Sequence, residues 1–269
     1  MKILAIDFDG VISDSALKSL FVSHNAYCRH FGDDVRKNFG GELFTFENWE
    51  QKKKEFSREI EKYQRLRSYI ELSGDFFVMI KIIEEGIEVN NQDDFRNVRN
   101  ELEFDYAFFH ELFFQEKERW QKKDFKKWFA LSPIYSEVVS GIRRFLTEGK
   151  KVVIATSNLG DAIHPAFHPD YLGFYIDRQD IFDKNYGKNK SDHMKAISSQ
   201  YRVGFQDIYF VDDQLSYLID TQKLGVNVFM AGWGYCTEEQ KDIARGKGIY
   251  IIEEEKDFYF VLKNSYGKR

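Results

Sequence analysis

Two aspartates stand one residue apart near the amino terminus, directly after an apolar run. The run ILAI, residues 3–6, is typical of a buried strand, and Asp7 and Asp9 follow it. A second acidic pair, Asp212 and Asp213, closes the apolar run IYFV. Carboxylates repel one another and are costly to bury alone, so such a cluster favours a bound hard cation such as Mg²⁺. A carboxylate can also attack phosphorus, while another protonates the leaving oxygen and then activates water.

The elements that position these acids alternate between strands and helices. Beyond residues 3–8, the segments that resemble strands are 150–156, 207–213, 226–233 and 248–254. Helices are expected over 134–148 and 191–201, with another that ends near Gly225. This alternation predicts a doubly wound α/β fold with a parallel sheet. Ligands bind beyond the carboxyl ends of such strands, where Asp7, Asp9, Thr156, Asp212 and Asp213 all fall.

Between the first two strands, residues 15–131 differ from the rest of the chain in composition and in the spacing of their apolar residues. They are rich in charged and aromatic residues at helical spacing, so we expect an inserted α-helical cap domain, with the α/β core formed by residues 1–14 and 132–269. One cap helix is expected over residues 70–85, ended by Gly86. Another is expected to carry a single apolar stripe of Leu102, Tyr106, Phe109 and Phe113.

The bulk composition narrows the functional classes. A net charge of -5 over 269 residues argues against a nucleic-acid partner, because phosphate backbones require a basic surface. The two cysteines, Cys28 and Cys236, are far apart and lack metal-ligand spacing, which favours reduced thiols. The sequence shows neither a signal-peptide layout nor an apolar run long enough to span a bilayer. We therefore expect a soluble cytoplasmic protein without a membrane partner, either a monomer or a homodimer.

Four segments, in order, resemble the motifs of the haloacid dehalogenase superfamily. They are DFDGVISDS, VVIATSN, GKNKSDHMKAI and IYFVDDQLSYLIDTQKLGV. The later segment AGWGY is similar to a loop of the phosphoglycolate phosphatase-like branch. The resemblance covers residues 1–15 and about 132–255. It implies a Rossmann-like core with an inserted helical cap. It also implies a Mg²⁺-dependent phosphatase that acts on a small phosphorylated metabolite.

The resemblance also implies a role for each matching catalytic residue. Asp7 would be the nucleophile, and it would form an aspartyl-phosphate. Asp9 would be the general acid and base. Thr156 would bind the phosphoryl oxygens, and Lys190 would neutralise their charge and orient Asp7. This inventory is chemically sufficient for phosphoryl transfer, in which a protein mainly positions groups and stabilises charge.

The remaining implied residues bind metal or substrate. The implied ligands of Mg²⁺ are Asp7, Asp9 through its backbone carbonyl, Asp212 and Asp213. The implied substrate-binding residues are Gly10, Ser157 and Asn158.

Two positions depart from the family pattern or leave it ambiguous. Ser216 stands where many members carry an additional aspartate of the fourth motif. Lys188 is an alternative to Lys190, which we favour because Ser191 directly after it is a natural helix cap.

Other functions remain compatible with the motifs. Asp9 favours phosphoryl transfer over dehalogenation, because the dehalogenases of the superfamily lack an acid at this position. A sugar-phosphate mutase or a phosphonate hydrolase of the same superfamily remains open. A non-catalytic binding protein on the same fold is the alternative outside the enzymes.

Overall fold

The computed structural model describes residues 1–31, 39, 41–102, 105–187 and 189–267. The chain forms two compact units. One, here called the α/β unit, comprises Met1–Asp14 and Pro133–Arg269, and the other, the helical unit, comprises Ser15–Ser132. Ser132, which we expected in the core, therefore falls in the helical unit.

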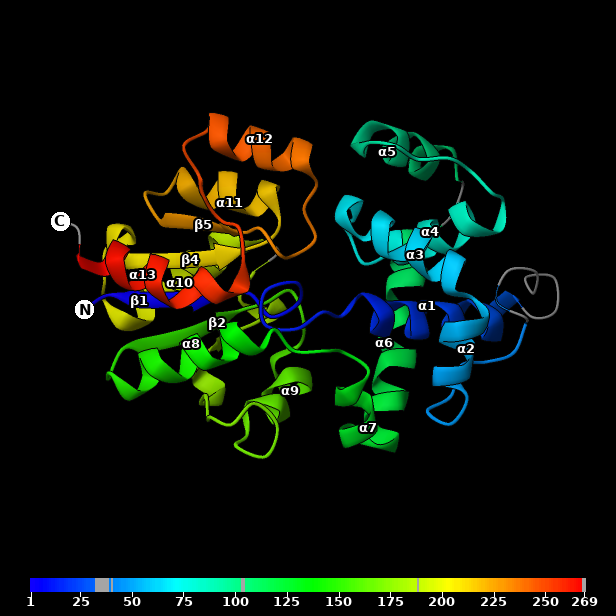
Figure 1. Cartoon of the computed structure of the whole chain (residues 1–269), viewed down its shortest axis with the longest axis horizontal. Coiled ribbons are helices and arrows are strands. Elements are labelled where there is room, and N and C mark those ends of the chain that lie inside the picture. The colour runs from blue at the N-terminus through cyan, green and yellow to red at the C-terminus, as the bar shows by residue number, and fades with distance from the viewer. Residues whose placement is uncertain (32–38, 40, 103–104, 188, 268–269) are drawn as a thin grey trace. The chain divides into compact units, whose positions relative to one another are not determined.

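The α/β unit is built on one sheet of six strands, all of them parallel (Figure 1). Its strand order is β3-β2-β1-β4-β5-β6. The strands are β1 (Ile3–Ile6), β2 (Lys151–Ala155), β3 (Ile181–Phe182), β4 (Ile208–Asp212), β5 (Asn227–Ala231) and β6 (Tyr250–Ile252). The predicted doubly wound fold is confirmed, and the sequence analysis missed only β3, whose two residues are too few for a periodic signal.

Helices cover both faces of this sheet because its strands are apolar on both sides. The helices are α8 (Ser136–Thr147), α9 (Gly160–Ile163), α10 (Lys190–Tyr201), α11 (Leu215–Gln222), α12 (Glu238–Gly246) and α13 (Phe258–Gly267). Ile3 and Ala5 belong to the core cluster that includes residues of α10, α11 and α12. The opposite face is covered by α8 and α13, which pack against each other (Figure 1).

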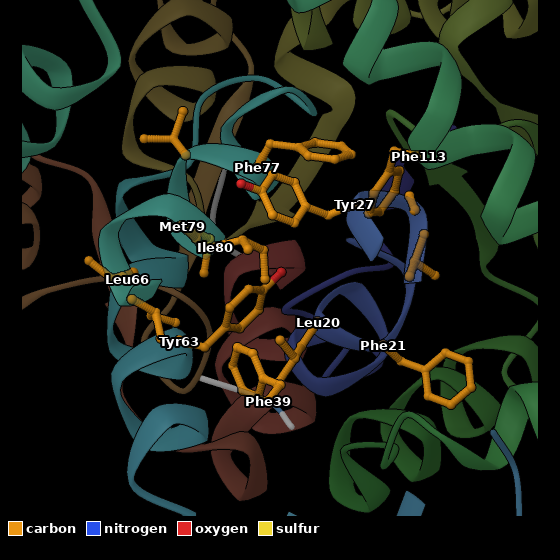
Figure 2. Packing of buried hydrophobic residues seen from close by; sticks show 14 of the residues in the cluster. Leu20, Phe21, Tyr27, Phe39, Tyr63, Leu66, Phe77, Met79, Ile80 and Phe113 are labelled. Carbon is orange, nitrogen blue, oxygen red and sulfur yellow. The ribbon is translucent and has the colours of Figure 1, made fainter. Parts of the chain in front are cut away.

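The helical unit surrounds an aromatic-rich core of its own. Its helices are α1 (Ala16–Phe31), α2 (Trp49–Glu55), α3 (Ser57–Leu66), α4 (Asp75–Glu84), α5 (Gln92–Glu101), α6 (Tyr106–Lys123) and α7 (Phe125–Ala130). Phe77 lies beside Tyr27 (Figure 2), and their ring centroids are 6.1 Å apart. Each large apolar side chain buried in this way contributes about 1.5–3 kcal/mol. None of the helices in the described ranges is long and apolar enough to cross a membrane.

Two expected helices of this unit differ from the structure. The helix expected over 70–85 begins only at Asp75, whose carboxylate accepts the backbone N–H groups of Glu71 and Leu72 at 2.8 and 2.9 Å. These bonds fold the preceding residues into a turn instead of a first helical turn. Leu102 does not share a helix with the rest of its expected stripe, because α5 ends at Glu101 and α6 begins at Tyr106.

His24 is buried in this aromatic core as a neutral imidazole. Its Nε2 atom donates a hydrogen bond to the Glu42 carbonyl at 2.9 Å, and its ring stacks on Phe44 with 4.1 Å between centroids. Burial lowers the pKa of His24 to about 4. The hydrogen bond to Glu42 opposes this shift, and the positive charge of Lys52 adds to it.

This buried histidine is expected to make the helical unit sensitive to acid. Between pH 6.5 and 4 the unfolded chain binds a proton that the folded chain does not, so the free energy of unfolding falls as the pH falls. The pKa of His24 falls from 6.5 in the unfolded chain to about 4 in the folded chain. This difference corresponds to about 3 kcal/mol of stability, which is fully lost below pH 4. His24→Gln keeps a donor for Glu42 and should flatten this part of the pH dependence.

Urea unfolding followed by tryptophan fluorescence measures the effect. Trp49, Trp120 and Trp128 all lie in the helical unit. His30→Gln, at an exposed position near the end of the same helix, is the matched control and should keep the wild-type pH dependence. The explanation is wrong if His24→Gln and the wild type lose stability equally between pH 6.5 and 4.

Candidate active site

The first and second acidic pairs meet because β1 and β4 are neighbours in the sheet. Ile6 pairs with Val211 in the parallel register, and the Asp7 N–H donates to the Val211 carbonyl at 3.0 Å. Asp7 and Asp212 are therefore adjacent at the carboxyl edge. On the other side of β1, Ile6 pairs with Ile154 of β2, which brings Thr156 to the same edge.

Three buried carboxylates gather at this edge. Asp7, Asp212 and Asp213 each offer an oxygen, and these oxygens lie within 4.8 Å of one another. Among the residues that the structure describes, this is the one such group of three acidic, histidine or cysteine side chains. So dense a group of carboxylates requires positive charge nearby.

Lys190 supplies that charge from the first turn of α10. Its side chain is 1% exposed, and its Nζ atom lies 2.6 Å from Asp7 Oδ1 and 3.3 Å from Asp212 Oδ2. The same ammonium donates to the Ala155 carbonyl at the end of β2. Lys190 thus connects three neighbouring strands at their carboxyl ends, β2, β1 and β4.

The electrostatics of this group reflect burial and mutual repulsion. Burial raises the pKa of Asp7 to about 7, against the attraction of Lys190, and the charges of Asp212 and Asp9 raise it further. Burial likewise raises the pKa of Asp212 to about 6, against Lys190 and with a contribution from Asp213. For Lys190 burial lowers the pKa, but the two carboxylates outweigh burial and the net shift is upward.

The other predicted residues line the same edge. Thr156 is buried, and its Oγ1 atom accepts the backbone N–H of Asn158 at 3.1 Å. The Asn158 amide donates to Asp9 Oδ2, which joins the loop after β2 to the loop after β1. Ser157, between Thr156 and Asn158, has an exposed side chain. Thr156, Ser157 and Asn158 therefore form one short loop beside Asp9.

Gly10 fits its position for a conformational and a steric reason. Its φ of +84° is a left-handed conformation that favours glycine. A Cβ atom there would lie 2.3 Å from Asp213 Oδ2, closer than any real contact allows. The structure thus assigns Gly10 a packing role against Asp213, and a substrate-binding role for it stays a prediction.

The loop after β5 forms hydrogen bonds both with Asp213 and with the loop after β1. The Tyr235 N–H donates to Asp213 Oδ2 at 2.8 Å, and the Tyr235 hydroxyl donates to Asp14 at 2.7 Å. Trp233 donates from its indole to the Val11 carbonyl at 3.2 Å. The segment AGWGY thus holds the loop after β1 and orients Asp213.

The structure bears on the two positions that the motifs left ambiguous, the choice between Lys188 and Lys190 and the serine at position 216. Lys190 lies in the acidic group, whereas Lys188 lies outside the described residues. The helix cap is not Ser191 as expected, because α10 begins at Lys190 and its cap is Asn189, whose side chain accepts from the Asp192 N–H. Ser216 in α11 is exposed, so it takes no part in the buried acidic group.

The acidic group fits a magnesium ion. Its ligands are hard oxygens, which this ion prefers. Asp212 Oδ2 is buried and accepts no hydrogen bond from the described residues, although Lys190 lies 3.3 Å away. A cation among Asp7, Asp212 and Asp213 would complete the neutralisation that one ammonium begins.

One residue at this edge was missed in the sequence analysis. Asp183 follows β3 and is fully buried, and its carboxylate accepts the N–H of Gly160 in the loop after β2. The only sequence signal was an aspartate after the apolar pair Ile181–Phe182, and many aspartates follow two apolar residues by chance.

Comparisons with known proteins place this geometry in context. No family model matches the chain, and no curated protein matches it. Among solved structures, a predicted phosphoglycolate phosphatase from Haemophilus somnus 129pt is 16% identical, with 98% of each chain covered and a TM-score of 0.59. A predicted phosphatase from Clostridium acetobutylicum is 13% identical, with 98% of each chain covered and a TM-score of 0.63.

A third solved structure carries a family description. It is a hydrolase, a haloacid dehalogenase-like family protein from Streptococcus pneumoniae, 10% identical, with 97% of this chain and 98% of that one covered and a TM-score of 0.56. At such identities the likeness establishes the fold. The chain therefore has the fold of the haloacid dehalogenase-like hydrolases, an α/β unit with a parallel sheet and a helical unit inserted after the first strand.

Proposed function

We propose that this chain is a magnesium-dependent phosphatase of the haloacid dehalogenase superfamily. It hydrolyses a small phosphorylated metabolite through an aspartyl-phosphate on Asp7. The observation that carries the proposal is the position of Lys190, whose ammonium lies 2.6 Å from Asp7 Oδ1 and 3.3 Å from Asp212 Oδ2. A buried lysine that orients one carboxylate among several is suited to a nucleophile that must meet an anionic substrate.

In the first step Asp7 attacks the phosphorus of the substrate. Lys190 holds Oδ1 of Asp7, which leaves Oδ2 to form the new bond to phosphorus. Thr156 Oγ1 already accepts the N–H of Asn158, so its own hydroxyl hydrogen is available for a phosphoryl oxygen. The bond from phosphorus to the leaving oxygen breaks, and Asp9 gives its proton to that oxygen.

In the second step water removes the phosphoryl group from Asp7. The Asp9 carboxylate, now deprotonated, takes a proton from the water as the water oxygen attacks phosphorus. The bond between phosphorus and Asp7 breaks, inorganic phosphate leaves and the Asp7 carboxylate is restored. Asn158, which donates to Asp9 Oδ2, keeps this carboxylate oriented through both steps.

Asp7, Asp212, Asp213 and the backbone carbonyl of Asp9 would hold the magnesium ion. When bound, it supplies positive charge that polarises the phosphoryl group. The substrate class follows from the charge of the site, because a buried ammonium and a cation together favour a compact dianionic phosphate.

Phosphate release from p-nitrophenyl phosphate, measured with magnesium and with a chelator, tests the proposal. We expect release with magnesium and at least a hundredfold less with chelator, followed by a preferred substrate in a panel of sugar, nucleotide and organic-acid phosphates. Magnesium binding without phosphate release would contradict the hydrolase assignment and favour the mutase or phosphonate alternatives. Loss of both would favour a binding protein.

A further inference from the structure

We infer that Asp183 is a positioning residue of the candidate active site. It holds the loop of residues 157–160 and, through this loop, Asn158, which donates to Asp9 in the proposed mechanism. The inference rests on the proposed function, since it assigns Asp183 an effect on phosphate binding and turnover. It adds a residue that lies outside the four sequence motifs and directly follows β3, a strand that the motifs do not include.

The first observation is the number of donors that meet this one carboxylate. Asp183 is 0% exposed. Its Oδ2 atom accepts the backbone N–H of Gly160 at 2.8 Å and the Arg178 guanidinium at 2.7 Å. Its Oδ1 atom accepts the backbone N–H of Asn185 at 2.9 Å. A buried carboxylate held by several donors, one of them charged, is a rigid anchor.

The second observation is that the anchored loop leads directly to the catalytic groups. Gly160 begins α9 and ends the loop that starts after Thr156. The next residue after the anchor, Lys184, donates its backbone N–H to the Asn158 carbonyl at 3.2 Å. Asn158 in turn donates to Asp9. The two residues that follow β3, Asp183 and Lys184, thus hold the loop at two points, on either side of Leu159.

The third observation is the tight packing of the anchor against the loop. A Cβ atom at Gly160 would lie 2.4 Å from Arg178 Cζ. Arg178 also donates to the Ile181 carbonyl at 3.1 Å and pairs with Asp161. The guanidinium therefore connects the start of β3, the anchor carboxylate and the first turn of α9. Loss of the Asp183 carboxylate should therefore free one side of this guanidinium and loosen its hold on the first turn of α9.

A matched control lies at the opposite end of the same strand. Asp180 directly precedes β3, is 5% exposed and pairs with Lys151 at 2.6 Å at the amino end of β2. Its second oxygen accepts the Tyr201 hydroxyl. Asp180 is therefore a buried, paired aspartate like Asp183, but it lies at the end of the sheet that the catalytic groups do not occupy.

The experiment compares Asp183→Ala and Asp180→Ala in the full chain. Five quantities are measured for each variant. They are the thermal midpoint, the magnesium affinity by calorimetry, the inhibition constant for inorganic phosphate, and kcat and KM for p-nitrophenyl phosphate. We expect both variants to lower the midpoint. We expect only Asp183→Ala to weaken phosphate inhibition and to lower kcat/KM, each at least tenfold, while magnesium affinity stays within threefold of wild type.

The outcomes separate this inference from the proposed function. Wild-type protein without magnesium-dependent phosphate release contradicts the proposed function itself. An active wild type with Asp183→Ala and Asp180→Ala equally impaired overturns the inference, because the effect is then general destabilisation. If Asp183→Ala does not fold, Arg178→Gln decides, since it removes the charged donor to Asp183 while the Asp183 carboxylate keeps the backbone N–H groups of Gly160 and Asn185. For Arg178→Gln we expect phosphate inhibition at least threefold weaker than in the wild type. An inhibition constant equal to that of the wild type overturns the inference.

Discussion

Asp7→Asn is expected to abolish phosphate release while the protein stays folded and binds its substrate. The amide has nearly the shape of the carboxylate but cannot attack phosphorus, so the rate should fall by about 10⁴-fold or more. Stability should change little. The substitution removes a negative charge that is already unfavourable, because Asp7 is buried and lies beside the charge of Asp212. Lys190 still has Asp212 and the Ala155 carbonyl as partners.

Asp9→Asn is the informative comparison, because it affects proton transfer and leaves the nucleophile in place. An aryl phosphate with a good leaving group needs little protonation, so its first step should be spared relative to that of an alkyl phosphate. The second step still needs the base, so the phosphorylated protein should accumulate and be detected by mass spectrometry after an acid quench.

Equal activity of Asp7→Asn and wild type would contradict the assignment of Asp7 as the nucleophile.

Lys190→Met is expected to destabilise the α/β unit and to reduce activity by about 10²–10³-fold, because the charge of the phosphoryl group is no longer neutralised. Methionine retains most of the volume but leaves Asp7 and Asp212 buried without their cation. Removal of one partner from a buried ionic group costs about 3–5 kcal/mol. The loss should be largest at neutral pH without magnesium, and added magnesium should reverse part of it.

The pH dependence of that loss has a defined sign. Without Lys190 the pKa values of Asp7 and Asp212 rise further above their unfolded value of 3.8, so the folded protein binds more protons than the unfolded chain. The free energy of unfolding should therefore fall as the pH rises from about 4 through these pKa values.

Lys195→Met on the same helix is the control, because its side chain is 57% exposed and its pairing with Asp192 contributes at most about 1 kcal/mol. Thermal unfolding from pH 4 to 8, with and without magnesium, measures the difference. Equal stability of the two variants would show that Lys190 does not balance the buried carboxylates.

The sequence by itself determined the class of fold and the identity of the acidic residues. Apolar strands alternating with helices leave few arrangements other than a parallel doubly wound sheet. In such a sheet, residues that directly follow the strands must share one edge. That is why Asp7, Thr156 and Asp212, distant in the chain, were expected together and lie at one edge.

Element boundaries were predicted less well where side chains compete with the backbone for hydrogen bonds. Asp75 accepts two backbone N–H groups ahead of α4 and delays its start. Asn189 caps α10 in place of Ser191. The sequence around Asp75 and Asn189 contains other residues that could serve as caps. Only the folded chain therefore shows which side chain accepts the unpaired N–H groups at the start of each helix.

Only the tertiary structure decided how the site is held together. Periodicity does not reveal a two-residue strand, so β3 and the anchor Asp183 could not be predicted from the sequence. The contacts of Lys190 with Asp7 and of Asn158 with Asp9 join residues more than 140 positions apart. Such contacts depend on strand order and register, which are set by packing across the whole sheet and not by any local pattern.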